Sequence, residues 1–126
     1  MLRTMMVAAF LISLSAPLLA ATPPAPFERA AFIRAQADGR TIIVESHASW
    51  CLPCRIQAPI IARLRGERAY AAVLVFRIGE KTPSAVWKRF RLTGYGTLVV
   101  FKGEREVGRG TPTSEAAVVQ LLRQAL

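Results

Sequence analysis

The sequence predicts one α/β domain, in which a mixed β-sheet of about four strands is covered by helices on both faces. Two observations lead to this fold class. The chain has 126 residues, which is enough for one small domain and too few for two. Within it, short β-branched apolar runs alternate with segments whose apolar residues recur at helical spacing. Strands joined by helical crossovers form a layered sheet of this kind.

The first half of the domain is placed by these periodicities. A helix is expected over 27–37, where Asp38-Gly39 stops it. A β-branched run over 41–46 predicts a buried central strand. The next helix is expected over 51–65, and a second buried strand over 72–76.

The second half continues the alternation. A proline at the first turn predicts a short helix over 83–90. Two glycines make 93–96 a loop. A third strand over 97–101 then returns through a tight turn as an edge strand over 105–108. A last helix is expected over 114–126, capped by Thr or Ser at its start.

The N-terminal part is not expected to belong to the folded domain. Residues 1–21 have a basic residue, an apolar run and small residues at the end, which is the pattern of a secretory signal peptide. An uncleaved N-terminal anchor is the alternative, since a bulky leucine stands before the cleavage position. The Pro-rich residues 22–26 are interpreted as an extended linker outside helices and strands, and 27–126 as the domain.

The chain is strongly basic, with 17 Lys and Arg against 8 Asp and Glu. The basic residues are scattered and are not interleaved with exposed aromatic residues, so no nucleic-acid partner is expected. Such a surface favours acidic partners or anionic membrane headgroups. We expect the protein to act as a monomer.

Both cysteines lie in one short motif, Trp50-Cys51-Leu52-Pro53-Cys54-Arg55. Two thiols one helical turn apart can close a small disulfide ring. A cysteine at a helix N-terminus has its thiolate stabilised by unpaired backbone amides, so Cys51 is the expected nucleophile. Cys54 can then attack the mixed disulfide and release the substrate. Export would let the disulfide persist between cycles.

This motif resembles the WCxPCK/R active site of the thioredoxin family, and the similarity runs from about Ile42 to the C-terminus. The resemblance implies a thioredoxin fold, a nucleophilic Cys51, a resolving Cys54 and no bound cofactor. Together with the leader, it is closest to the exported thioredoxin-like proteins of bacteria. It therefore predicts a periplasmic or membrane-anchored protein that acts on protein disulfides and dithiols and depends on a membrane electron donor.

The resemblance also assigns residues around the cysteines. Glu45 stands where the family carries a buried acid, and is expected behind Cys54, exchanging a proton with that thiol; an ordinary surface acid is the alternative. Trp50 and Pro53 are expected to contact substrate. His47 replaces an aromatic residue and is interpreted as a hydrogen-bonded structural histidine, with tuning of the thiolate as the alternative.

Gly96 departs from the family pattern. Tyr95-Gly96 aligns with the loop in which the family has a cis-proline facing the cysteines. A cis bond before a non-proline residue costs about 2.5 to 4 kcal/mol, so this bond is expected to be trans. We expect a more mobile loop and uncovered space beside the sulfur atoms, with Tyr95 and Gly96 still binding substrate.

These observations predict an exported thiol:disulfide oxidoreductase that reduces specific periplasmic protein disulfides. One alternative is a metal-binding module in which Cys51, Cys54 and His47 hold Cu(I). Two thiolates are too few for a closed zinc site, and no metal is assigned. The other alternative is a redox-silent interaction domain with a structural disulfide.

Overall fold

The computed structural model describes residues 22–126, so the predicted signal peptide lies outside the described residues. In chain order the elements are β1 (Ala25–Pro26), α1 (Arg29–Ala37), β2 (Thr41–Ser46), α2 (Leu52–Arg65), the 3₁₀ helix η1 (Arg68–Tyr70), β3 (Leu74–Ile78), α3 (Ser84–Arg89), β4 (Leu98–Lys102), β5 (Arg105–Gly110) and α4 (Glu115–Arg123). Within these described residues, none of the helices is both long and apolar enough to span a bilayer.

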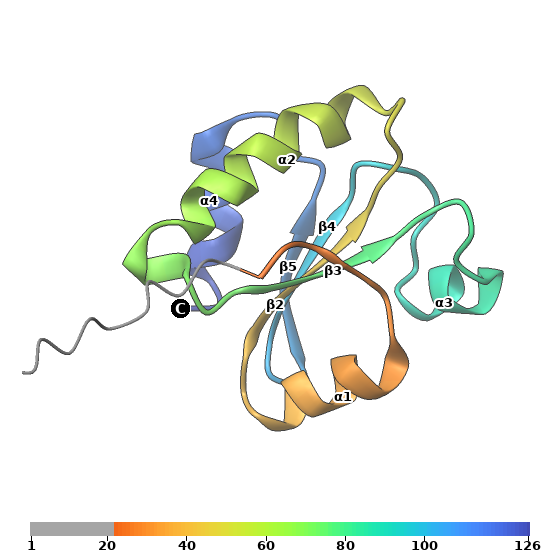
Figure 1. Cartoon of the computed structure of the whole chain (residues 1–126), viewed down its shortest axis with the longest axis horizontal. Helices are drawn as coiled ribbons and strands as arrows, with labels where there is room; N and C mark the ends of the chain where they lie inside the picture. Colours follow the sequence, from red (N-terminus) through yellow and green to blue (C-terminus); the bar gives the residue numbers. More distant parts are fainter. Residues whose placement is uncertain (1–21) are drawn as a thin grey trace, which may run out of the picture.

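The strands form one five-stranded mixed sheet in the order β1-β3-β2-β4-β5. The central strand β2 runs parallel to β3 and antiparallel to β4. Figure 1 shows α2 and α4 on one side of this sheet and α1 and α3 on the other. The predicted fold class is therefore confirmed, with one strand more than the four expected.

The additional strand, β1, corrects the interpretation of residues 22–26 as a linker outside the sheet. Ala25 and Pro26 pair with Phe76 and Arg77 of β3. The backbone N–H of Phe27 continues the pairing by donating to the Arg77 carbonyl at 2.9 Å. Proline is tolerated here because β1 is an edge strand, which needs hydrogen bonds on one side only.

Several predicted ends also move: β3 continues to Ile78, β5 continues to Gly110, and α4 ends at Arg123 and not at 126. Two of the starts move for local reasons. Helix α1 begins at Arg29 and not at 27, because the Glu28 carboxylate caps it by accepting the N–H groups of Ala30 and Ala31. Strand β3 begins at Leu74 and not at 72, because the turn that follows η1 still includes residue 73.

Each face of the sheet has its own core. The cluster under α2 and α4 contains Ile43, Ile61, Leu64, Leu98, Val100, Val118 and Leu122. The cluster under α1 and α3 contains Phe32, Ile42, Val44, Phe76, Phe90, Val99 and Phe101. Side chains alternate between the faces along a strand. Glu45 therefore shares the α2 face with Ile43, and it is buried with 3% of its surface exposed.

Candidate active site

The two cysteines lie where the loop after β2 enters α2. Cys51 is the N-cap of the helix, and its Sγ accepts the Cys54 backbone N–H at 3.4 Å. The two Cα atoms are 5.3 Å apart, and the pair is joined as a disulfide, as predicted. The helix N-terminus places partial positive charge beside Cys51, which stabilises its thiolate after reduction.

Cys51 is flanked in the sequence by two large apolar residues, Trp50 and Leu52. Trp50 is 64% exposed and Leu52 is 66% exposed, whereas Cys51 and Cys54 are buried. The Trp50 indole is fixed in place because its Nε1–H donates to the Glu80 carboxylate at 2.6 Å. Exposed apolar surface is therefore present next to Cys51 in the chain, and contact of Trp50 with substrate stays a prediction.

The aromatic surface extends beyond Trp50. The Tyr95 ring makes edge-to-face contacts with Trp50, at 4.9 Å between ring centroids, and with Trp87 of α3, at 5.2 Å. The Trp87 Nε1–H donates to the Gly79 carbonyl at 3.3 Å. Sequence reasoning placed Trp87 only as an apolar position of a helix, because its contact with Tyr95 joins two segments through the tertiary fold.

The loop at Gly96 is bonded to two neighbouring elements. The Tyr95–Gly96 bond is trans as predicted, and Gly96 has φ +90°. A Cβ on Gly96 would lie 2.9 Å from the Pro53 Cβ, so a larger residue would not fit here without a shift, and the expected space beside the sulfur atoms stays a prediction. The Gly96 N–H donates to the Ser46 carbonyl at 2.7 Å and the Gly96 carbonyl accepts from Gln57 at 2.7 Å, which ties the loop to β2 and α2. The greater mobility of this loop stays a prediction.

Glu45 is the buried acid that the sequence predicted, and it is ion-paired. Arg77, its neighbour across the β2–β3 ladder, donates from Nε to the Glu45 carboxylate at 2.5 Å. The two residues line a cavity of about 230 Å³ together with Arg65 and Ala58 of α2. The helix residues that line it, from Ala58 to Arg65, lie beyond Cys54 along α2.

Cys54 contacts strand β2, which also carries Glu45. The Cys54 Sγ lies 3.5 Å from the Ser46 carbonyl, and Ser46 directly follows Glu45. Glu45 thus lies behind α2, on the side of the helix that Cys54 faces. Sequence reasoning missed Arg77 and Arg65, because the strand register and the end of α2 bring them to Glu45 from distant positions.

Glu45 also influences the pKa values of two nearby basic residues, Arg65 and His47. Arg65 is only 4% exposed and donates from Nε to the Val73 carbonyl at 2.8 Å. Burial lowers the pKa of Arg65, and the Glu45 carboxylate opposes that shift. Burial also lowers the pKa of His47, Arg77 lowers it further, and Glu45 opposes both.

The copper alternative lacks a ligand set in the described part of the chain. Across residues 22–126, no three His, Cys, Asp or Glu side chains gather in a way that could hold a metal ion. His47 lines a separate surface cavity with Glu80 and Lys81. The structure does not bring His47 together with Cys51 and Cys54 as a third ligand.

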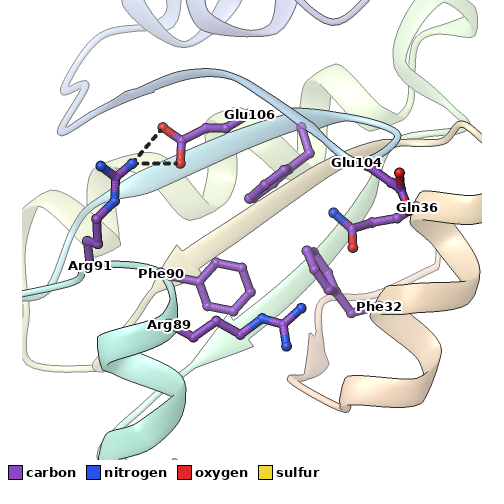
Figure 2. A pocket seen from close by; sticks show the side chains of 8 residues that line it. Phe32, Gln36, Arg89, Phe90, Arg91, Glu104 and Glu106 are labelled. Carbon is purple, nitrogen blue, oxygen red and sulfur yellow. Dashed lines mark hydrogen bonds and ion pairs between the residues drawn. The ribbon is translucent and has the colours of Figure 1, made fainter.

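A hollow of about 330 Å³ lies on the other face of the sheet, between α1 and the end of α3. Figure 2 shows the rings of Phe32 and Phe90 beside the Arg89 side chain, whose guanidinium carbon is 5.8 Å from each ring centroid. Arg91 is paired with Glu106 at the rim. This hollow faces away from α2, so it is separate from the cysteine site.

A two-cysteine pair at a helix N-terminus, on an α/β sheet with a buried acid behind it, defines a thiol–disulfide redox protein. The thioredoxin family model matches residues 25–124, and the chain belongs to the thioredoxin family. Together with the cysteine pair, this membership makes the chain a thioredoxin-like thiol:disulfide oxidoreductase. Thioredoxins act on protein disulfides.

Individual relatives agree with the family match. Thioredoxin-2 of Saccharomyces cerevisiae is 26% identical over 83 residues, which cover 66% of this chain and 78% of that protein. The crystal structure of Trxlp from Edwardsiella tarda has 31% identity and a TM-score of 0.72, covering 78% of this chain and 96% of that one. A peptide-N(4)-(N-acetyl-beta-glucosaminyl)asparagine amidase of Caenorhabditis briggsae is 28% identical over 87 residues, which are 69% of this chain but only 14% of that much longer protein.

Proposed function

We propose that the protein is an exported oxidoreductase that reduces specific protein disulfides in the periplasm. The observation that carries this proposal is the position of Cys51. Its sulfur caps α2 by accepting the Cys54 backbone N–H and forms a disulfide with Cys54, and the Cα atoms of the two cysteines are 5.3 Å apart. The exposed Trp50 and Leu52 beside it provide the surface on which a protein substrate docks.

The reaction begins from the reduced protein. The Cys51 thiolate attacks one sulfur of the substrate disulfide, so the Cys51–substrate bond forms, the substrate S–S bond breaks, and one substrate thiolate leaves and takes up a proton. Cys54 then loses its proton and attacks the Cys51 Sγ. The second substrate thiolate leaves, two electrons have passed to the substrate, and the protein holds a Cys51–Cys54 disulfide.

Glu45 is proposed to exchange the proton with Cys54. Its support is its burial and its position on the face of the sheet under α2, one residue from the carbonyl that Cys54 contacts. The Arg77 Nε–H donates to this carboxylate and holds it in place. A carboxylate in this position accepts the Cys54 proton during attack and returns it during the reverse reaction.

The substrate contacts are proposed to come from Trp50, Pro53, Tyr95 and Gly96. Pro53 packs against Gly96, and Tyr95 packs against Trp50, so these residues form one continuous rim. A firm, shaped rim favours particular protein partners over any accessible disulfide.

Export and the source of electrons are proposed from the N-terminal sequence. Residues 1–21 have the pattern of a signal peptide or anchor, and a dithiol oxidised in the periplasm needs a membrane donor to return it to the reduced state. Fractionation of cells that produce the full chain, with N-terminal sequencing of the product, tests this part. Export predicts periplasmic or membrane-bound protein, and recovery of the intact chain from the cytosol contradicts it.

The redox proposal is tested by the reduction potential of the Cys51–Cys54 pair together with the rate of insulin reduction by dithiothreitol. We expect a potential in the reducing range of thioredoxins, about −270 mV, and acceleration that is lost in Cys51→Ser. The Cys54→Ser variant should accumulate mixed disulfides with its substrates, which identifies them. If insulin reduction is no faster with the wild-type protein than without it, the proposal fails.

A further inference from the structure

The loop that replaces the family proline is held by a buried amide from α2. Gln57, three residues after Cys54, is 3% exposed. Its Nε2 donates to the Gly96 carbonyl at 2.7 Å and to the Pro112 carbonyl at 2.9 Å. Both amide hydrogens of one side chain are therefore used to join α2 to two separate loops.

Ser46 holds the other side of the same loop. Its carbonyl accepts the Gly96 N–H at 2.7 Å, and its Oγ accepts the Thr97 N–H at 2.9 Å. A proline has no N–H, whereas glycine brings one that needs a partner when it is buried. Here that N–H points inward to β2, and Gln57 takes the Gly96 carbonyl, so both polar groups of Gly96 are satisfied inside the protein.

These contacts leave the preceding peptide available. Among residues 22–126, the backbone N–H and C=O of Tyr95 have no hydrogen-bond partner. The Tyr95 ring is packed between Trp50 and Trp87, next to the exposed rim of the disulfide. An extended peptide lying along this rim would find one donor and one acceptor at Tyr95, as at the edge of a sheet.

The backbone at Gly96 needs such support. Its φ of +90° is a conformation that glycine adopts without strain, and its Cα approaches Pro53 closely. Glycine also has the largest backbone freedom when it is not constrained. Without the donor of Gln57, the Gly96 carbonyl would be buried and unpaired, and the loop would relax toward other conformations.

We propose that Gln57 is a positioning residue that holds the Tyr95–Gly96 segment in place for pairing with an extended backbone segment of a protein substrate. The inference rests on the proposed reduction of protein disulfides. It assigns Gln57 no contact with the reacting sulfur atoms. Small disulfides have no peptide backbone that could pair with Tyr95. Gln57 should therefore affect the reduction of protein substrates and not that of small disulfides.

The test compares Gln57→Met, which keeps the side-chain length and removes both donors, with Gln120→Met on the exposed face of α4 as the matched control. Steady-state reduction is measured with a protein substrate, insulin, and with a small disulfide, 5,5′-dithiobis(2-nitrobenzoate). For Gln57→Met we expect KM for insulin to rise about tenfold, from the loss of two hydrogen bonds, and the rate with the small disulfide to stay within about twofold. Gln120→Met should match the wild type with both.

A second variant separates positioning from folding. Gln57→Glu keeps the shape but can donate to a carbonyl only when its carboxyl is protonated. Its KM for insulin should be raised at neutral pH and should fall toward the wild-type value as the pH is lowered. An equal loss with both substrates, or an unchanged KM for insulin in folded Gln57→Met, overturns the proposal.

Hydrogen exchange tests the position of the loop without relying on catalytic activity, because it reports on the backbone amides directly. In Gln57→Met the amides of Gly96 and Thr97 should exchange faster than in the wild type, while those of β3 are unchanged. Wild-type protein that reduces neither disulfide defeats the proposed function. Unchanged exchange at Gly96 and Thr97 defeats the positioning role of Gln57.

Discussion

The two faces of the sheet are built from different kinds of side chain. Under α1 and α3, phenylalanine rings pack edge to face, with centroids 5.2 Å apart for Phe32 and Phe90 and 5.5 Å for Phe32 and Phe101. Under α2, the buried set includes Glu45, Gln57 and Arg65 beside the aliphatic core. The same sheet therefore has one face that is entirely apolar at its centre and one that carries polar groups.

The difference shows how chemistry and stability are divided in a small domain. Each polar side chain under α2 has a partner: Glu45 has Arg77, Gln57 has the Gly96 carbonyl, and Arg65 has the Val73 carbonyl. In the described residues no buried side-chain nitrogen or oxygen lacks a hydrogen bond. Polar burial is tolerated when it is satisfied, and it contributes less net stability than apolar packing.

The largest effect is expected on the apolar face. Phe32→Ala removes the ring at the centre of the aromatic cluster and should lower the free energy of unfolding by about 3 to 5 kcal/mol. Urea denaturation measures the loss. The folded fraction should keep the wild-type reactivity of Cys51 toward iodoacetamide. Loss of that reactivity per folded molecule would mean that the faces are not independent.

The next largest effect is expected on the polar face, and it is an effect on the reaction rate rather than on stability. Glu45→Gln keeps the size of the side chain and removes the proton acceptor, so the Cys54-dependent step should slow by about 10²-fold. Rapid-quench measurement of mixed-disulfide decay follows this step. Glu106→Gln, an exposed acid on β5 paired with Arg109, is the control. An unchanged decay rate in Glu45→Gln would remove Glu45 from the mechanism.

A still smaller effect is expected where the two faces meet at the rim. Trp87→Ala removes the contact of α3 with the Tyr95 ring and should raise KM for insulin about three- to tenfold, the equivalent of one aromatic pair. Trp87→Phe should restore most of the affinity. If kcat falls while KM is constant in Trp87→Ala, the residue acts on the chemistry and not on substrate binding.

The smallest effect is a dependence of stability on pH at His47. Burial places the folded pKa of His47 below its usual value of 6.5, so the unfolded chain binds the proton more readily. The stability from this residue is therefore complete above about pH 6.5 and is lost as the pH falls through that value toward the folded pKa. The urea midpoint should drop less between pH 7 and 5.5 in His47→Gln than in the wild type. Glu28 and Glu106, whose pKa values lie below 4.5, contribute only at more acidic pH. An equal drop in both proteins contradicts the prediction.

The local features were predictable from the sequence because their signals are local. The β-branched run Thr41–Ser46 and the helical period after Cys51 each depend on neighbouring residues, and both elements form where expected. The spacing of Cys51 and Cys54 is also enough to predict their pairing. The strand at Ala25–Pro26 escaped prediction because it exists only through pairing with β3.

The site was predictable only in part. Glu45 was predicted because it stands where the thioredoxin pattern carries a buried acid, but its partner Arg77 is set by the register of β2 on β3. The consequences of Gly96 could not be inferred from the residue alone. Whether the loop would be open or filled depended on Pro53 and Gln57, which approach it from α2.

By itself, the sequence determined the order of elements and the dithiol at a helix N-terminus, because residue type and spacing along the chain specify these, whereas the buried acid was predicted from the resemblance to the thioredoxin family. The tertiary structure decided what surrounds them: the Arg77 and Arg65 charges at Glu45, the Trp87–Tyr95 contact and the fixed loop at Gly96. The charges at Glu45 and the bond from Gln57 to Gly96 join residues about 20 to 40 positions apart in the chain, and the Trp87–Tyr95 contact joins α3 to the loop after it. Only the packing of α2 and α3 on the sheet brings these residues together.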